Sequence, residues 1–138
     1  MSRDLTKDRE TYIRQLRGEA EDVKKLIGLY KKRRPIVIEF SGSPKSGKTS
    51  GINSLMQFFK RNDFKVKVLR ESAGVCPVKD KHSPLFNLWT ACDSIKSLVG
   101  VLESERALYD VVILDRGIFD AMCWFQWLFN SGKMSGKM

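Results

Sequence analysis

One short run of this 138-residue sequence has residue types and spacing suited to binding phosphate. Gly42 and Gly47 are separated by four residues, and Lys48 and Thr49 follow at once, so the run reads G-x-x-x-x-G-K-T. Glycines let a backbone curl with its N–H groups pointing inward, toward phosphate oxygens. The lysine of such a loop reaches the β- and γ-phosphates, and the threonine hydroxyl holds Mg²⁺. We therefore expect ATP or GTP to bind, with Mg²⁺, at Gly42, Ser43, Pro44, Lys45, Ser46, Gly47, Lys48, Thr49 and Ser50.

Charged pairs stand at the ends of two later stretches that read as strands. Arg70 and Glu71 follow an alternating run, and Asp115 and Arg116 end a run of four apolar, β-favouring residues. In open α/β sheets the ligand crevice lies outside the carboxyl ends of the strands, so these charges are expected to face a substrate. A surface ion pair is the alternative for Arg70 and Glu71. Asp115 has the position of the acid that holds Mg²⁺ in phosphate-loop proteins, and Arg116 is placed to contact phosphate.

The elements that must position these residues alternate between strand and helix. Strand, helix, strand, long helix and strand in succession predict parallel, right-handed βαβ units. The continuous apolar run at 36–40 predicts a strand buried on both faces. Its one acid, Glu39, is either a residue of the site or a satisfied internal acid, and the alternation at 65–69 predicts a strand nearer the sheet edge. The expected strands are 36–40, 65–69 and 110–116, and the expected helices are 48–62, 84 to 102 or 108, and 118–130.

An amphipathic and basic helix is expected before the first strand, over about 4–32. Gly18 and Gly28 weaken it and could each break it. It either packs on its own domain or binds a partner. Residues 1–34 hold 11 Lys and Arg against 6 Asp and Glu, about half of the net charge of +9. Such a charge fits a basic solvated surface, with nucleic acid as the less favoured alternative.

Cysteine count and hydropathy indicate a cytoplasmic protein. Cys76, Cys92 and Cys123 are odd in number and far apart, which favours reduced thiols over a zinc site or a disulfide framework. No secretory signal and no membrane span is expected, because the N-terminus is charged and no apolar run is long enough. The one histidine, His82, is expected to be an ordinary surface residue.

The last expected helix, 118–130, is apolar almost all round and should be covered. Only the polar 131–138 segment, with its repeated Ser-Gly-Lys-Met, follows, and we expect it to be flexible. The 118–130 helix and the N-terminal helix are therefore the surfaces expected to contact a second copy or a partner protein. We expect three parts: the basic helix at 1–34, an α/β core at 35–130 and a flexible tail at 131–138.

With these motifs in view, residues 36–130 resemble the thymidylate kinase and deoxynucleoside kinase branch of P-loop kinases. The resemblance implies a three-layer P-loop NTPase fold, here with about three strands, and Mg-ATP-dependent phosphoryl transfer to a nucleoside, nucleotide or similar small acceptor. It implies Lys48, Glu71 and Arg116 as catalytic residues, with Glu71 as base or hydroxyl contact. It implies an acceptor site formed by Arg70, Glu71, Phe86, Asn87, Trp89 and Arg116.

The sequence departs from that family at three places. Ser41 stands where the thymidylate kinase loop commonly has Glu, and Glu39 lies two places earlier. Gly117 follows the Asp-Arg pair, where an aromatic or Ser is usual. The chain also stops before the lid arginines and further strands, so we expect a truncated form that binds nucleotide more readily than it uses it. A nucleotide-dependent switch or assembly ATPase, and a nucleic-acid-binding protein or polynucleotide kinase, are the alternative functions.

Overall fold

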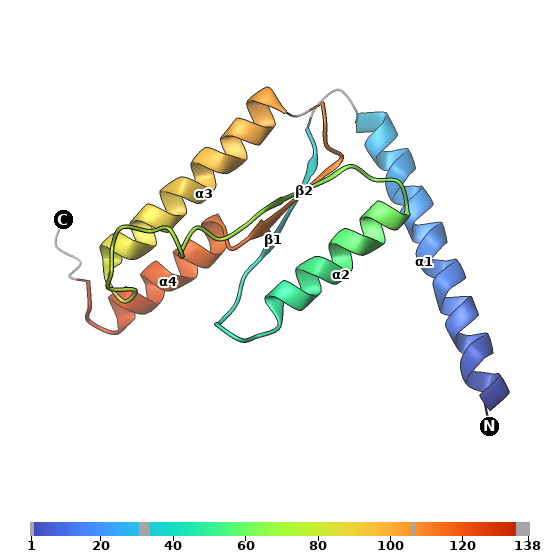
Figure 1. Ribbon diagram of the computed structural model, residues 1–138, viewed down its shortest axis with the longest axis horizontal. Helices are drawn as coiled ribbons and strands as arrows, with labels where there is room; N and C mark the ends of the chain where they lie inside the picture. The colour runs from blue at the N-terminus through green and yellow to red at the C-terminus, as the bar shows by residue number, and fades with distance from the viewer. Residues whose placement is uncertain (1, 31–33, 106, 135–138) are drawn as a thin grey trace.

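The computed structural model describes residues 2–30, 34–105 and 107–134. These residues form a mixed α/β fold with four helices and a three-stranded parallel sheet, as expected (Figure 1). Residues 31–33 of the basic run and residues 135–138 of the expected flexible tail lie outside the described residues.

The sheet gathers the three expected strands with their carboxyl ends on one edge. β1 (Ile36–Phe40), β2 (Val66–Leu69) and β3 (Val111–Asp115) are parallel and lie in the order β1-β3-β2. The register pairs Phe40 of β1 with Asp115 of β3, and Leu69 of β2 with Leu114. The segments that follow β1, β2 and β3 therefore leave the sheet side by side.

The strand buried on both faces is β3. Val112 and Ile113 are fully buried, whereas Ile36 and Val37 of β1 are 40% and 42% exposed. The prediction that β1 is buried on both faces is wrong, because β1 is an edge strand among the described residues and β3 occupies the centre. An apolar run reports that a strand has apolar neighbours but not which strand lies between the others. The expected edge position of β2 is confirmed.

Helices cover both faces of the sheet. α2 (Lys48–Arg61) lies on one face, and α3 (Pro84–Ser104) and α4 (Ile118–Asn130) lie on the other (Figure 1). Ser83 caps α3 by accepting a hydrogen bond from the Leu85 N–H, which places the start of this helix at the expected proline. Successive side chains of β3 alternate between the two layers. The cluster toward α2 contains Ala20, Ile52, Phe59, Phe64, Val111 and Ile113, and the cluster toward α3 contains Val101, Val112 and Leu114.

α1 (Ser2–Tyr30) is one uninterrupted helix that packs on the domain only in part. Neither Gly18 nor Gly28 breaks it. Ala20 is 2% exposed and contributes to the α2 cluster, but Tyr12 and Leu29 are 60% and 80% exposed. Figure 1 shows the N-terminal half of α1 running past the end of α2. The middle of α1 therefore packs on its own domain, whereas contact of α1 with a partner stays a prediction.

α4 buries a narrow face and exposes a wide apolar one. Asp120, Ala121 and Leu128 are buried, whereas Phe119 and Met122 are 68% and 60% exposed. The expected uncovered apolar surface is therefore present among the described residues. None of the helices in the described part of the chain is both long and apolar enough to cross a bilayer.

Candidate functional site

The segments after the three strands, together with α3 and α4, line an open cavity of about 510 Å³. The 42–49 loop follows β1, Arg70 and Glu71 follow β2, and Asp115 and Arg116 close β3. The charged residues expected to meet at this edge of the sheet do so. The cavity is lined by Pro44, Lys45, Lys48, Thr49, Arg70, Glu71, Ser72, Ala73, Lys81, His82, Phe86, Asn87, Thr90, Ala91, Ser94, Asp115, Arg116, Gly117, Asp120, Ala121, Trp124 and Leu128.

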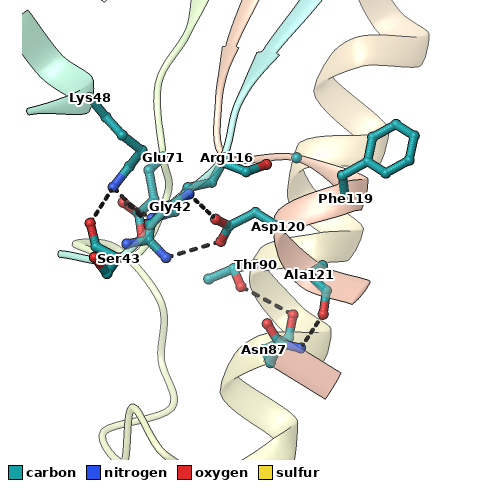
Figure 2. A network of polar contacts seen from close by, with 12 residues as sticks. Gly42, Ser43, Lys48, Glu71, Asn87, Thr90, Arg116, Phe119, Asp120 and Ala121 are labelled. Carbon is teal, nitrogen blue, oxygen red and sulfur yellow. Dashed lines mark hydrogen bonds and ion pairs between the residues drawn. The ribbon is translucent and has the colours of Figure 1, made fainter. Parts of the chain in front are cut away.

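The 42–49 loop is curled back on itself. Gly42 and Gly47 have φ values of 147° and 86°, which favour glycine, and Lys45 has a φ of 65°. The Lys48 ammonium donates to the carbonyl oxygens of Gly42, at 3.0 Å, and Ser43, at 3.1 Å (Figure 2). α2 begins at Lys48 directly behind the loop, and no side chain of the described residues caps it. The N–H groups of its first turn have no partner within the helix, an arrangement that suits an anion.

Arg116 is held in a strained backbone conformation at the end of β3. Its φ is 65°, which an arginine adopts only when its surroundings enforce it. Two contacts do so here: the Arg116 N–H donates to the Phe40 carbonyl at 3.1 Å, and the Arg116 carbonyl accepts from the Ser94 hydroxyl at 3.2 Å. The strain therefore directs the Arg116 side chain, which is 15% exposed, into the cavity region.

The guanidinium of Arg116 lies between two carboxylates. Its Nη1 donates to Asp120 Oδ2 at 3.0 Å, and its Nε lies 3.2 Å from Glu71 Oε2. The Nε contact is an ion pair without hydrogen-bond alignment, so Nε has no hydrogen-bond partner among the described residues. Glu71 and Arg116 are thus brought together as the sequence predicts. Glu71 therefore pairs with Arg116 at the cavity and not with Arg70, whose Nη2 donates to Asn53 Oδ1 at 3.2 Å.

Asp120 was missed by sequence reasoning and is the most buried acid of the cavity lining. It is 6% exposed, and its Oδ1 accepts the Gly42 N–H at 3.0 Å while Oδ2 holds Arg116. A carboxylate is rarely buried unless it is paired. The signal available in the sequence was a single acid in an otherwise apolar helix, which should have pointed to a buried partner.

Glu39 is a satisfied internal acid, one of the two readings of this residue. Its carboxylate accepts the backbone N–H groups of Gly117, at 3.0 Å, Phe119, at 3.3 Å, and Asp120, at 2.8 Å. It therefore caps the start of α4 and ties this helix to the end of β1. A Cβ atom at residue 117 would lie 2.7 Å from Glu39 Oε2, so a residue larger than glycine would displace this carboxylate. Glu39 and Gly117, at which the sequence departs from the resembled family, are therefore in contact with each other.

On the acceptor side, the structure brings Phe86 and Asn87 to the cavity but leaves Trp89 out of its lining. Two helical residues span about 200°, so Trp89 and Asn87 point to opposite sides of α3. The Asn87 amide donates to the Ala121 carbonyl at 3.1 Å and joins α3 to α4 (Figure 2). His82 and Trp124 line the cavity although neither was predicted. Their residue types gave no specific signal, because loop histidines and helix aromatics are common outside sites.

The arrangement offers an anion-binding loop, a Thr49 hydroxyl and an Asp115 carboxylate, and a charged cluster around Arg116 in one cavity. Among the described residues, no three or more His, Cys, Asp or Glu side chains are grouped so that they could hold a metal by themselves. Such a cavity can hold a polyanion at one part and a small polar molecule beside it. Comparisons with protein-family models, curated proteins and solved structures found no match to this chain.

Proposed function

We propose that this protein transfers a phosphoryl group from ATP or GTP to a small acceptor, in the manner of the thymidylate and deoxynucleoside kinases that it resembles. One observation carries the proposal: the 42–49 loop, Asp115 and the Glu71–Arg116 pair all line a single cavity. Its volume of about 510 Å³ lies within the range of about 300–1,000 Å³ that is usual for small-molecule sites.

The triphosphate binds at the 42–49 loop. Its phosphates accept hydrogen bonds from the uncapped N–H groups at the start of α2. Lys48 already donates to two carbonyl oxygens beside this place and exchanges them for β- and γ-phosphate oxygens. The Lys48 ammonium and the uncapped start of α2 thus support a triphosphate site at this loop.

Thr49 and Asp115 would hold Mg²⁺ together with the phosphates. Both line the cavity, and the register that pairs Phe40 with Asp115 sets this acid beside the strand that feeds the loop. Mg²⁺ in nucleotide sites is commonly bound through one or two protein oxygens and the substrate phosphates, which fits this donor set. Bound there, the ion neutralises charge that develops on the phosphates during transfer.

Glu71 and Arg116 face the acceptor. Arg116 contacts phosphate on the donor or the acceptor, and Glu71 accepts the acceptor's hydroxyl proton or orients that hydroxyl. One Glu71 oxygen is committed to Arg116, which leaves the other for the acceptor. Phe86 and Asn87 line the same cavity and contact the rest of the acceptor.

Mg-ATP titration by calorimetry tests the donor half of the proposal. Lys48→Ala removes charge-assisted hydrogen bonds of about 1.5–3 kcal/mol, so we expect Mg-ATP affinity to fall roughly 10- to 100-fold. Arg9→Ala is the matched control, because Arg9 is an exposed residue of α1 outside the cavity. Equal Mg-ATP affinity in the wild type and Lys48→Ala would remove the phosphate-loop assignment.

A screen of nucleosides, nucleotides and small hydroxylated metabolites for Mg-ATP-dependent phosphorylated product tests the acceptor half. We expect product from at least one of them. ATP hydrolysis at the same rate with and without every acceptor would favour an assembly or switch ATPase instead.

A further inference from the structure

Capping of its own helix does not explain why the Asp120 carboxylate is buried. A carboxylate in the first turn of a helix ordinarily serves the exposed N–H groups there. In α4 that role belongs to Glu39, which accepts three of these N–H groups, including the one of Asp120 itself. The Asp120 carboxylate is instead directed away from α4, toward two groups from other elements.

Those two groups come from opposite halves of the site. Oδ1 accepts the N–H of Gly42, the first residue of the 42–49 loop after β1, and Oδ2 accepts Nη1 of Arg116 at the end of β3, each at 3.0 Å. Each carboxylate oxygen has one partner, so the carboxylate bridges loop and guanidinium (Figure 2). Since the Asp120 N–H is itself fixed by Glu39, at 2.8 Å, the bridge starts from a backbone position that is also tied to β1.

We propose that Asp120 is a positioning residue that holds the Arg116 guanidinium at a set place relative to the 42–49 loop. This inference rests on the function proposed above. A guanidinium has five N–H donors. One is used by Asp120, and Nε is paired with Glu71 by charge without hydrogen-bond alignment, so the other three are left for a phosphoryl group between donor and acceptor. Without Asp120 the Arg116 side chain keeps its charge but loses its fixed orientation relative to the loop.

We therefore expect a change at Asp120 to weaken binding of the transition state and to leave binding of the nucleotide in the ground state nearly unchanged. Lys48 and the N–H groups of α2 hold a nucleoside diphosphate, whereas Asp120 contacts the loop at the Gly42 N–H, which the Oδ1 atom of an Asn side chain can also accept. Arg116 acts on the group in transfer, so only ligands that fill the place of that group should depend on Asp120. Misplacement of a charged group by about 1 Å can cost on the order of 100-fold in rate.

The experiment uses two probes on the full chain: Mg-ADP alone, and Mg-ADP with aluminium fluoride, which fills the place of the transferring phosphoryl group. In the wild type we expect aluminium fluoride to tighten Mg-ADP binding roughly 100-fold. In Asp120→Asn we expect Mg-ADP affinity within about threefold of the wild type and an aluminium fluoride effect reduced to roughly tenfold or less. Each variant must first show a cooperative melt.

A double-mutant cycle separates positioning from general damage. If Asp120 acts through Arg116, then Arg116→Gln and Asp120→Asn together lose no more of the aluminium fluoride effect than Arg116→Gln alone. Asp93→Asn is the matched control. It makes the same change in α3, where Asp93 accepts from Ser72 and lies outside the cavity lining, so the aluminium fluoride effect should stay as in the wild type.

The outcomes separate the two proposals. Absence of Mg-ADP and Mg-ATP binding in the wild type overturns the proposed function and this inference with it. Tight Mg-ADP binding with an unchanged aluminium fluoride effect in Asp120→Asn, or with additive losses in the double variant, overturns the role of Asp120 alone. Absence of any aluminium fluoride effect in a wild type that binds Mg-ADP removes Arg116 as a contact of the transferring group, and the role of Asp120 with it.

Discussion

Gly117 and Glu39 form a contact whose energetic coupling can be measured. A Cβ atom at Gly117 would lie 2.7 Å from Glu39 Oε2, 2.8 Å from Glu39 Cδ and 3.0 Å from Leu114 Cδ2. The φ of Gly117 is −144°, outside the positive range that favours glycine, so we estimate the cost of a substitution from the close contact. Gly117→Ala therefore acts through this contact, and it displaces the carboxylate that caps α4.

Two penalties set the size of the effect. Forcing an extra methyl group into a packed site costs typically 1–3 kcal/mol. Weakening a helix cap costs about 0.5–2 kcal/mol. We expect Gly117→Ala to lower the free energy of unfolding by about 2 kcal/mol, a value that lies within both ranges. At roughly 4 °C for each kcal/mol in a chain of this length, the melting temperature falls by about 8 °C.

Urea denaturation of four proteins tests this reasoning: the wild type, Gly117→Ala, Glu39→Ala and the double variant. Once Glu39 is shortened the close contact with its carboxylate is gone, so Gly117→Ala should cost less than about 1 kcal/mol in the Glu39→Ala background. Gly100→Ala is the control, since nothing lies within 4 Å of its Cβ position in α3, and we expect it to be neutral or stabilising by up to about 1 kcal/mol. Strictly additive costs in the double variant, or a Gly117→Ala protein as stable as the wild type, would refute the coupling.

Three further predictions concern Glu71, the proposed base, and the helices α4 and α1. Glu71→Gln should keep Mg-ATP affinity within about threefold while product formation falls roughly 100-fold or more, measured with the best acceptor of the screen; unchanged turnover would remove Glu71 from the mechanism. At high protein concentration the wild type should self-associate through the exposed face of α4, and Met122→Lys with Phe129→Lys should shift sedimentation toward the monomer. A wild type that stays monomeric with a cooperative melt would contradict this. Ala20→Leu should destabilise the fold by about 1–3 kcal/mol because Ala20 is 2% exposed in a packed cluster, whereas Leu29→Lys, at an 80% exposed position, should change stability by less than about 0.5 kcal/mol in the same urea assay.

The local sequence pattern was sufficient to predict the strands, the helices and the functional residues that directly follow the strands. The glycine spacing of the 42–49 loop, the alternation before Arg70 and the apolar run before Asp115 each report on a few neighbouring residues, and period and turn chemistry are properties of such short windows. From them follow the α/β class, the parallel sheet and the meeting of charged residues at one sheet edge. The carboxyl ends of parallel strands lie on the same edge of the sheet, so these residues are brought to that edge in any strand order.

Only the tertiary structure decided which elements are neighbours. β3 rather than β1 is central, and Asp120 reaches Gly42 across 78 residues of chain because α4 starts beside the end of β1. The same juxtaposition places Glu39 against Gly117, and the rotation of α3 keeps Trp89 out of the cavity that Trp124 lines. Periodicity states which face of an element is apolar, but a contact between distant side chains depends on strand order and helix rotation, which no local window contains.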